Sequence, residues 1–125
     1  MLAEARVEAV VPTTDLKRAR TFYEDVVGLT PDGSHASDAE VAYPLGGSSK
    51  LVLYEHGQIL APAHTAAHFV VADVEAAVAE LRGRGVLFEE YDLPALKTVD
   101  GVATIDGSKL AWFKDPDLNV IGIHD

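Results

Sequence analysis

An internal duplication is the feature that most limits how this chain can fold. Residues 7–28 read as a short β-branched strand, a cap at Asp15 or Thr14, an amphipathic helix and a closing Gly28. Residues 68–85 repeat this order, with Asp73 in the capping position. Because there are only two copies, the pattern predicts two related modules and not a long repeat array.

Strand-like segments and tight turns follow each predicted helix. Each module therefore reads as βαβββ, which makes the chain an α+β protein. One sheet covered by one helix leaves its other face open, so we expect the modules to form a curved mixed sheet, a half-barrel, around a small-molecule cavity. We predict a single domain over residues 1–125, with modules at about 5–57 and 66–125 and a linker at about 58–65. The expected strands are 7–11, 40–45 and 50–56, then 68–72, 86–91, 101–105, 110–114 and 119–124.

Composition excludes several function classes. The chain has no cysteine, which rules out disulfides, thiolate zinc sites and a cysteine nucleophile. Its formal charge of −10, with no Lys/Arg cluster, disfavours nucleic acid as a partner. No apolar run approaches the ~20 residues that span a bilayer. Residues 1–6 do not resemble a signal peptide, so we expect a cytoplasmic protein that binds no membrane.

Two motifs carry a resemblance to a known family. The first is Asp15-Leu-x6-Tyr23-x4-Gly28-Leu29, and the second is Ala111-Trp-Phe-Lys-Asp-Pro-Asp-Leu-Asn119, in which Leu118 replaces the usual Gly. With the duplication, these motifs resemble the vicinal-oxygen-chelate superfamily of glyoxalase I, extradiol dioxygenases, fosfomycin-resistance enzymes and bleomycin-resistance proteins. The resemblance implies the two-module fold and a homodimer. It leaves function open, because this fold hosts enzymes as well as drug binders.

The resemblance also implies four metal-ligand positions, most of which hold no ligand in this chain. Glu8 occupies the first and could bind a metal, but Ala66 and Gly122 occupy two others. The remaining one falls near 51–53, where the leucines offer no donor atom. We therefore expect no metal or other cofactor. The alternative is a divalent metal on a shifted set of ligands: Glu8, His68, His124 and either Glu55 or His56.

The candidate site residues follow from the faces that these strands would present to the cavity. Glu8 and His68 are the candidates for catalysis, because a carboxylate and an imidazole can act as acid and base. We expect Trp112 rather than its neighbour Phe113 to face the cavity. The predicted ligand-binding residues are Tyr43, Tyr54, His56, Val70, Trp112, Gly122 and His124.

Three functions compete at this point. The first is a metal-independent protein that sequesters a small apolar or aromatic ligand, in the manner that the resemblance to bleomycin-resistance proteins implies. The second is a glyoxalase-like lyase or isomerase that uses Glu8 and His68, with or without a divalent metal. The third is a protein-interaction module whose groove is filled by a partner.

Overall fold

The computed structural model describes residues 1–34, 37–58 and 64–125. The chain divides into two compact units, the first Met1–Leu60 and the second Ala61–Asp125, which are described separately. One predicted module lies in each unit, and most of the predicted linker lies outside the described residues. Helices and open mixed sheets occur together, so the predicted α+β class is confirmed, with sheets of the kind that form half-barrels.

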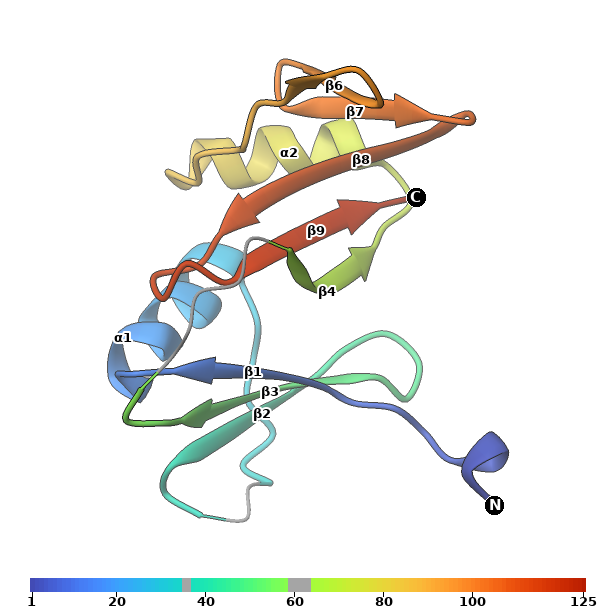
Figure 1. Cartoon of the computed structure of the whole chain (residues 1–125). Coiled ribbons are helices and arrows are strands. Elements are labelled where there is room, and N and C mark those ends of the chain that lie inside the picture. Colours follow the sequence, from blue (N-terminus) through green and yellow to red (C-terminus); the bar gives the residue numbers. More distant parts are fainter. Residues whose placement is uncertain (35–36, 59–63) are drawn as a thin grey trace. The chain divides into compact units, whose positions relative to one another are not determined.

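The first unit contains a three-stranded mixed sheet in the order β1-β3-β2 (Figure 1). A short 3-10 turn, Leu2–Glu4, precedes β1 (Ala9–Thr13), and β2 (Glu40–Pro44) and β3 (Lys50–Glu55) form a hairpin. Strand β1 is parallel to β3, whereas β2 is antiparallel to it. The described part of this unit has two strands after its helix, one fewer than the βαβββ pattern predicts.

Strand β1 is shifted by two residues from the predicted 7–11, because it begins at Ala9, includes Pro12 and ends at Thr13. Proline cannot donate a backbone hydrogen bond, but β1 lies at the edge of its sheet, where only one side of the strand needs pairing.

The helix of the first unit begins and ends where its sequence signals predict. Helix α1 (Leu16–Thr21) continues into a π-helical segment, η2 (Phe22–Val27). At its start, the Asp15 side chain accepts a hydrogen bond of 3.1 Å from the Arg18 main-chain N–H. At its end, Gly28 adopts the left-handed conformation, with φ of 91°.

The second unit contains a six-stranded mixed sheet in the order β4-β9-β8-β7-β6-β5. Strand β4 is parallel to β9, and the other neighbours are antiparallel. Helix α2 contacts β8, and Figure 1 shows it beside the sheet. The elements are β4 (Thr65–Val70), α2 (Val74–Gly83), β5 (Asp92–Leu93), β6 (Leu96–Val99), β7 (Val102–Ile105), β8 (Ser108–Lys114) and β9 (Val120–His124).

Helix α2 confirms the second predicted cap. The Asp73 side chain accepts a hydrogen bond of 3.0 Å from the Ala76 main-chain N–H. Val74, Val78 and Leu81 are buried, so the predicted apolar stripe faces the protein interior. No helix in the described ranges is long and apolar enough to cross a membrane.

Two strand predictions for the second unit are wrong. Strand β4 begins at Thr65 and ends at Val70, earlier than the predicted 68–72. The predicted strand 86–91 forms only one isolated bridge, between Phe88 and Phe113. Beyond this bridge the Tyr91 main-chain N–H donates to the Thr98 side chain at 2.8 Å, and an unpredicted hairpin, β5–β6, follows.

Candidate functional site

Three strands of the second unit place an imidazole, a glycine and an indole in one row. In the sheet register, Gly122 on β9 lies opposite His68 on β4 and opposite Trp112 on β8. Directly opposed residues point to the same face of a sheet, so His68 and Trp112 flank Gly122 on one face. Phe113 points to the other face, where it is fully buried, as the alternation along β8 predicts.

The His68 ring occupies the space that a side chain at position 122 would need. A Cβ atom added to Gly122 would lie 2.5 Å from both Cε1 and Nδ1 of His68. This separation is far below the usual contact distance of about 3.5–4.0 Å between non-bonded carbon atoms. The presence of the imidazole here therefore depends on the glycine opposite it.

A second imidazole lies beside the first. The ring centroids of His68 and His124 are 5.1 Å apart, with an interplanar angle of 70°. The pKa of His68 is lowered, first because partial burial disfavours the charged ring and second because the His124 ring is close. His68 is therefore predominantly neutral at pH 7.

The two histidines border an open pocket of about 470 Å³ on this face. Val70 shares the face, since it lies opposite His124 in the register, and it is 72% exposed. The residues that line the pocket are His68, Ile105, Asp106, Ser108, Leu110 and His124.

An apolar cluster continues the same face next to the pocket. Trp112 is 8% exposed and packs in one cluster with Ala103 and Val120. The Tyr91 ring lies edge-on to the Trp112 ring, with centroids 5.6 Å apart. Burial and the nearby Glu89 carboxylate raise the pKa of Tyr91, so its hydroxyl stays protonated at neutral pH.

Several of these residues were not among the sequence-based candidates. They come from the β7–β8 hairpin and from the segment before β5, and they reach the site only through the strand register. Strand alternation on β8 would place Leu110 on the face of Trp112, but nothing local in the sequence indicates the other positions. The added residues are Tyr91, Ile105, Asp106, Ser108 and Leu110.

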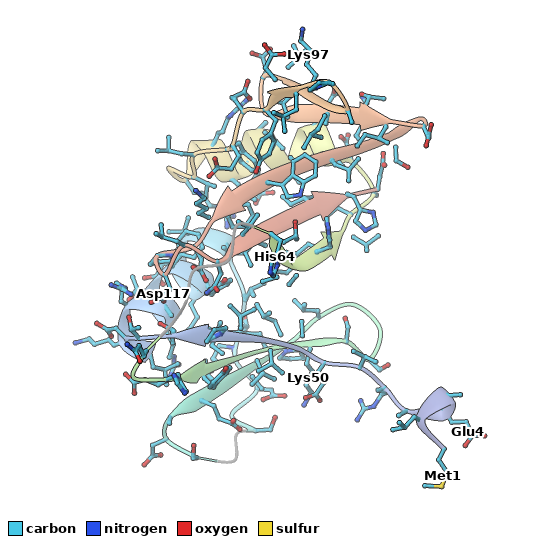
Figure 2. All side chains as sticks on the ribbon, viewed as in Figure 1. Met1, Glu4, Lys50, His64, Lys97 and Asp117 are labelled. Atoms are coloured by element: carbon cyan, nitrogen blue, oxygen red, sulfur yellow. The ribbon has the colours of Figure 1, made fainter. Side chains whose placement is uncertain are left out.

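The open face of the first unit holds a separate pocket, of about 530 Å³. It brings together two predicted residues, Glu8 and Tyr54, and Glu8 is exposed directly before β1. Lys50, labelled in Figure 2, lies at one end and forms an ion pair of 3.2 Å with Asp32. The lining residues are Glu8, Val10, Ser34, Glu40, Ala42, Lys50, Val52 and Tyr54.

The charged end of this pocket is held by local hydrogen bonds. Ser34 donates to Asp32 from both its main-chain N–H and its hydroxyl, and these bonds, with the ion pair to Lys50, lower the pKa of Asp32 to about 2. Asp32 is therefore ionised throughout the neutral range and holds the Lys50 ammonium group at the pocket edge.

Tyr43 does not reach this open face. It lies opposite Leu51 in the register, on the helix-covered face, and is fully buried. Its hydroxyl donates to Glu24 Oε2 at 3.2 Å, and the Arg20 guanidinium holds the same carboxylate at 2.7 Å. Burial and the Glu24 charge raise the pKa of Tyr43 above its ordinary value. The structure thus places Tyr43 in the core, unlike Tyr54.

His56 and Glu55 are engaged locally at the end of β3. The His56 Nδ1 atom lies 2.7 Å from the main-chain oxygen of Gln58, and the ring is 6.3 Å from that of Tyr54. Glu55 accepts a hydrogen bond of 3.3 Å from the Leu16 main-chain N–H at the start of α1. Both side chains therefore stabilise the local backbone.

The residues at the implied ligand positions of the second unit do not fit a metal ion. Ala66 and Gly122 have no donor atoms in their side chains, and the His68 ring fills the space beside Gly122. No group of three or more His, Asp or Glu within the described ranges is arranged to hold a metal ion.

The comparisons with known proteins agree with this fold. The sequence profile of the Glyoxalase/Bleomycin resistance protein/Dioxygenase superfamily matches residues 6–123. The chain belongs to this superfamily. It is a member in which a histidine packs against a glycine at an implied ligand position.

Solved structures of other superfamily members resemble this one over nearly the whole chain. A glyoxalase/bleomycin resistance protein from Streptomyces sp. CB03234 is 25% identical with a TM-score of 0.68, covering 97% of this chain and 100% of that one. TnmS3, an antibiotic binding protein from the same organism, is 26% identical with a TM-score of 0.67, covering 97% and 95%. A glyoxalase family protein from Enterococcus faecalis is 18% identical with a TM-score of 0.73, covering 100% of both chains, and supports the fold alone. No curated protein matches.

Proposed function

We propose that this superfamily member binds and sequesters a small, largely apolar or aromatic molecule, without a metal ion, at the open face of its second unit. The observation that carries the proposal is the packing of His68 over Gly122. A position where the resemblance implies a metal-binding carboxylate is instead part of a ring-lined surface.

The chemistry of the face supports an aromatic ligand. His68 and His124 present flat rings to the pocket, and Leu110 and Ile105 add aliphatic surface. The Trp112 and Tyr91 rings pack beside the pocket on the same face. A site of several hundred Å³ with apolar walls and a few polar groups is typical for small organic ligands. The similarity to TnmS3, described as an antibiotic binding protein, supports the same class of function.

Energy transfer from tryptophan provides a direct test, because Trp112 is the only tryptophan of the chain. The neutral probe N-phenyl-1-naphthylamine should bind saturably and show emission excited through Trp112. His68→Ala should weaken binding, whereas His64→Ala is a matched control, since His64 lies exposed just ahead of β4 (Figure 2).

Metal dependence is tested on the same protein. Probe binding should be unchanged by EDTA, and metal analysis of native, untagged protein should find no stoichiometric divalent ion. A tightly held stoichiometric ion, or binding that EDTA abolishes and Zn²⁺ restores, would reject the metal-free part of the proposal. Absence of saturable probe binding would reject the site.

A second candidate function is a lyase or isomerase for which Glu8 and His68, each in a pocket of its own unit, are the candidate acid and base. The lowered pKa of His68 favours it, because a neutral imidazole can accept a proton at pH 7. Glu8→Gln should then abolish turnover of a 2-oxoaldehyde–thiol adduct while probe affinity is retained. Absence of turnover by the wild-type protein, or unchanged turnover by the variant, would reject this function.

We also propose that the chain forms a homodimer. In each unit the first strand lies at an edge of the sheet and carries an exposed valine, Val10 on β1 and Val70 on β4. An unpaired edge strand favours association with another chain. Light scattering should give twice the chain mass of 13.3 kDa, and a monomer at micromolar concentration would contradict the proposal.

A further inference from the structure

The hydrogen bond made by the His124 ring determines which ligands its pocket can recognise. The Nδ1 atom of His124 lies 3.0 Å from the main-chain oxygen of Asp125. A main-chain oxygen can only accept a hydrogen bond, so Nδ1 must carry the hydrogen of this contact. In the neutral imidazole the hydrogen on Nδ1 leaves Nε2 as an acceptor.

The backbone around His124 keeps this arrangement in place. The Val71 N–H donates to the His124 main-chain oxygen at 2.8 Å, and the Lys109 N–H donates to the Asp125 carboxylate at 2.9 Å. Strands on both sides therefore restrain the end of β9, and the Asp125 oxygen stays available to the His124 ring.

The surroundings of His124 disfavour an anionic ligand. Among the described residues that line the pocket, Asp106 is acidic and none is Lys or Arg. The nearby Lys109 is engaged elsewhere, since its Nζ lies 2.9 Å from Glu75 on α2. The whole chain carries a formal charge of −10, which adds to the repulsion of anions.

We infer that this pocket selects neutral aromatic alcohols, of the phenol or naphthol class, whose hydroxyl donates a hydrogen bond to Nε2 of His124. The aromatic body lies against Leu110 and Ile105 of the same pocket, and the His68 ring centroid lies 5.1 Å from that of His124. This inference rests on the proposed binding function and adds a chemical class of ligand to it.

The hydroxyl contributes through one hydrogen bond. A net value of about 0.5–1.5 kcal/mol for such a bond corresponds to a preference of about 2- to 12-fold over a ligand of the same shape that cannot donate. Ligands that place an anion at this position should bind more weakly still.

Three probes test the inference: 2-naphthol, 2-methoxynaphthalene and naphthalene, titrated calorimetrically at pH 7.5. The methyl ether keeps the oxygen of 2-naphthol but has no hydrogen to donate. The wild-type protein should prefer 2-naphthol to both others by about 2- to 12-fold. His124→Phe keeps a flat ring and should reduce this preference to about one, while His64→Phe should leave it unchanged.

The possible results distinguish a failure of this inference from a failure of the proposed binding function. Equal affinities of the wild-type protein for the three probes would overturn the inference and leave aromatic binding intact. A preference that survives in His124→Phe would also overturn it, because the acceptor would then be another group. Failure of all three probes to bind would overturn the proposed function and this inference together. The wild-type comparison needs no variant, so it stands even if His124→Phe does not fold.

Discussion

Gly122→Ala is expected to displace the His68 ring without disrupting β9. Gly122 is not in the left-handed region, so the backbone itself accepts a side chain there. The added Cβ would lie 2.5 Å from two atoms of the His68 ring and 3.3 Å from its Cγ. To restore a normal contact of about 3.5 Å, the ring must move by about 1 Å.

The change in stability is the balance of two opposing effects. Overpacking typically costs about 1–3 kcal/mol, and the low end applies here because the exposed imidazole can rotate toward solvent. Replacing Gly by Ala at an unstrained position gains about 0.4–1 kcal/mol by restricting the unfolded chain. The net change in unfolding free energy should therefore be small, within about 0.6 kcal/mol of zero.

A double-mutant cycle isolates the contact. In a His68→Ala background the ring is absent, so Gly122→Ala should stabilise by about 0.4–1 kcal/mol. The two backgrounds should thus differ by about 1 kcal/mol in urea denaturation followed by Trp112 fluorescence. Gly83→Ala is the matched control, because an added Cβ there meets no atom within 4 Å and its effect should be equal in both backgrounds.

The same variant should affect binding more than stability. A ring moved by about 1 Å no longer sits beside His124 as it does in the wild-type protein, so affinity for N-phenyl-1-naphthylamine should fall. The reasoning is refuted if Gly122→Ala changes the unfolding free energy equally with and without His68, since the ring would then not occupy the space above the glycine.

Three further outcomes are expected. Asp15→Ala removes the cap of α1 and should lower the unfolding free energy by about 1 kcal/mol in urea denaturation, whereas Asp15→Asn should keep most of it. Tyr43→Phe removes the hydroxyl bound to Glu24 and should cost about 1 kcal/mol by thermal denaturation. Its probe affinity should be unchanged, and a large loss would contradict the placement of Tyr43 in the core. Because the native pKa of His68 is below 6.5, the unfolded chain takes up this proton first on acidification. The His68 contribution to stability is therefore complete above pH 6.5 and is lost as pH falls below it. His68→Asn should make the urea midpoint depend less on pH between pH 7.5 and 5.5, and an unchanged pH dependence would contradict the lowered pKa.

Sequence reasoning was most successful where a signal acts within a few residues. Asp15 and Asp73 cap helices because each carboxylate reaches an N–H three residues ahead, and Gly28 ends its helix because it tolerates a positive φ. The duplication and the two motifs led to the superfamily, and the βαβββ pattern of each module predicted the α+β class.

Strand partners could not be read in the same way. The segment 86–91 has a strand-like composition, but it pairs with β8 at one bridge only, and the hairpin β5–β6 takes the outer place in the sheet. Pairing depends on which segments meet in space, and local β-propensity does not determine that.

In the candidate site, too, side-chain chemistry follows from the sequence, whereas the neighbours of each side chain follow from the fold. The sequence by itself determined that Ala66 and Gly122 offer no metal ligand, because that depends only on side-chain chemistry. It also identified His68, Trp112 and His124 as candidates. Only the tertiary structure decided that Gly122 lies between His68 and Trp112, because that neighbourhood exists only through the register of three strands distant in sequence.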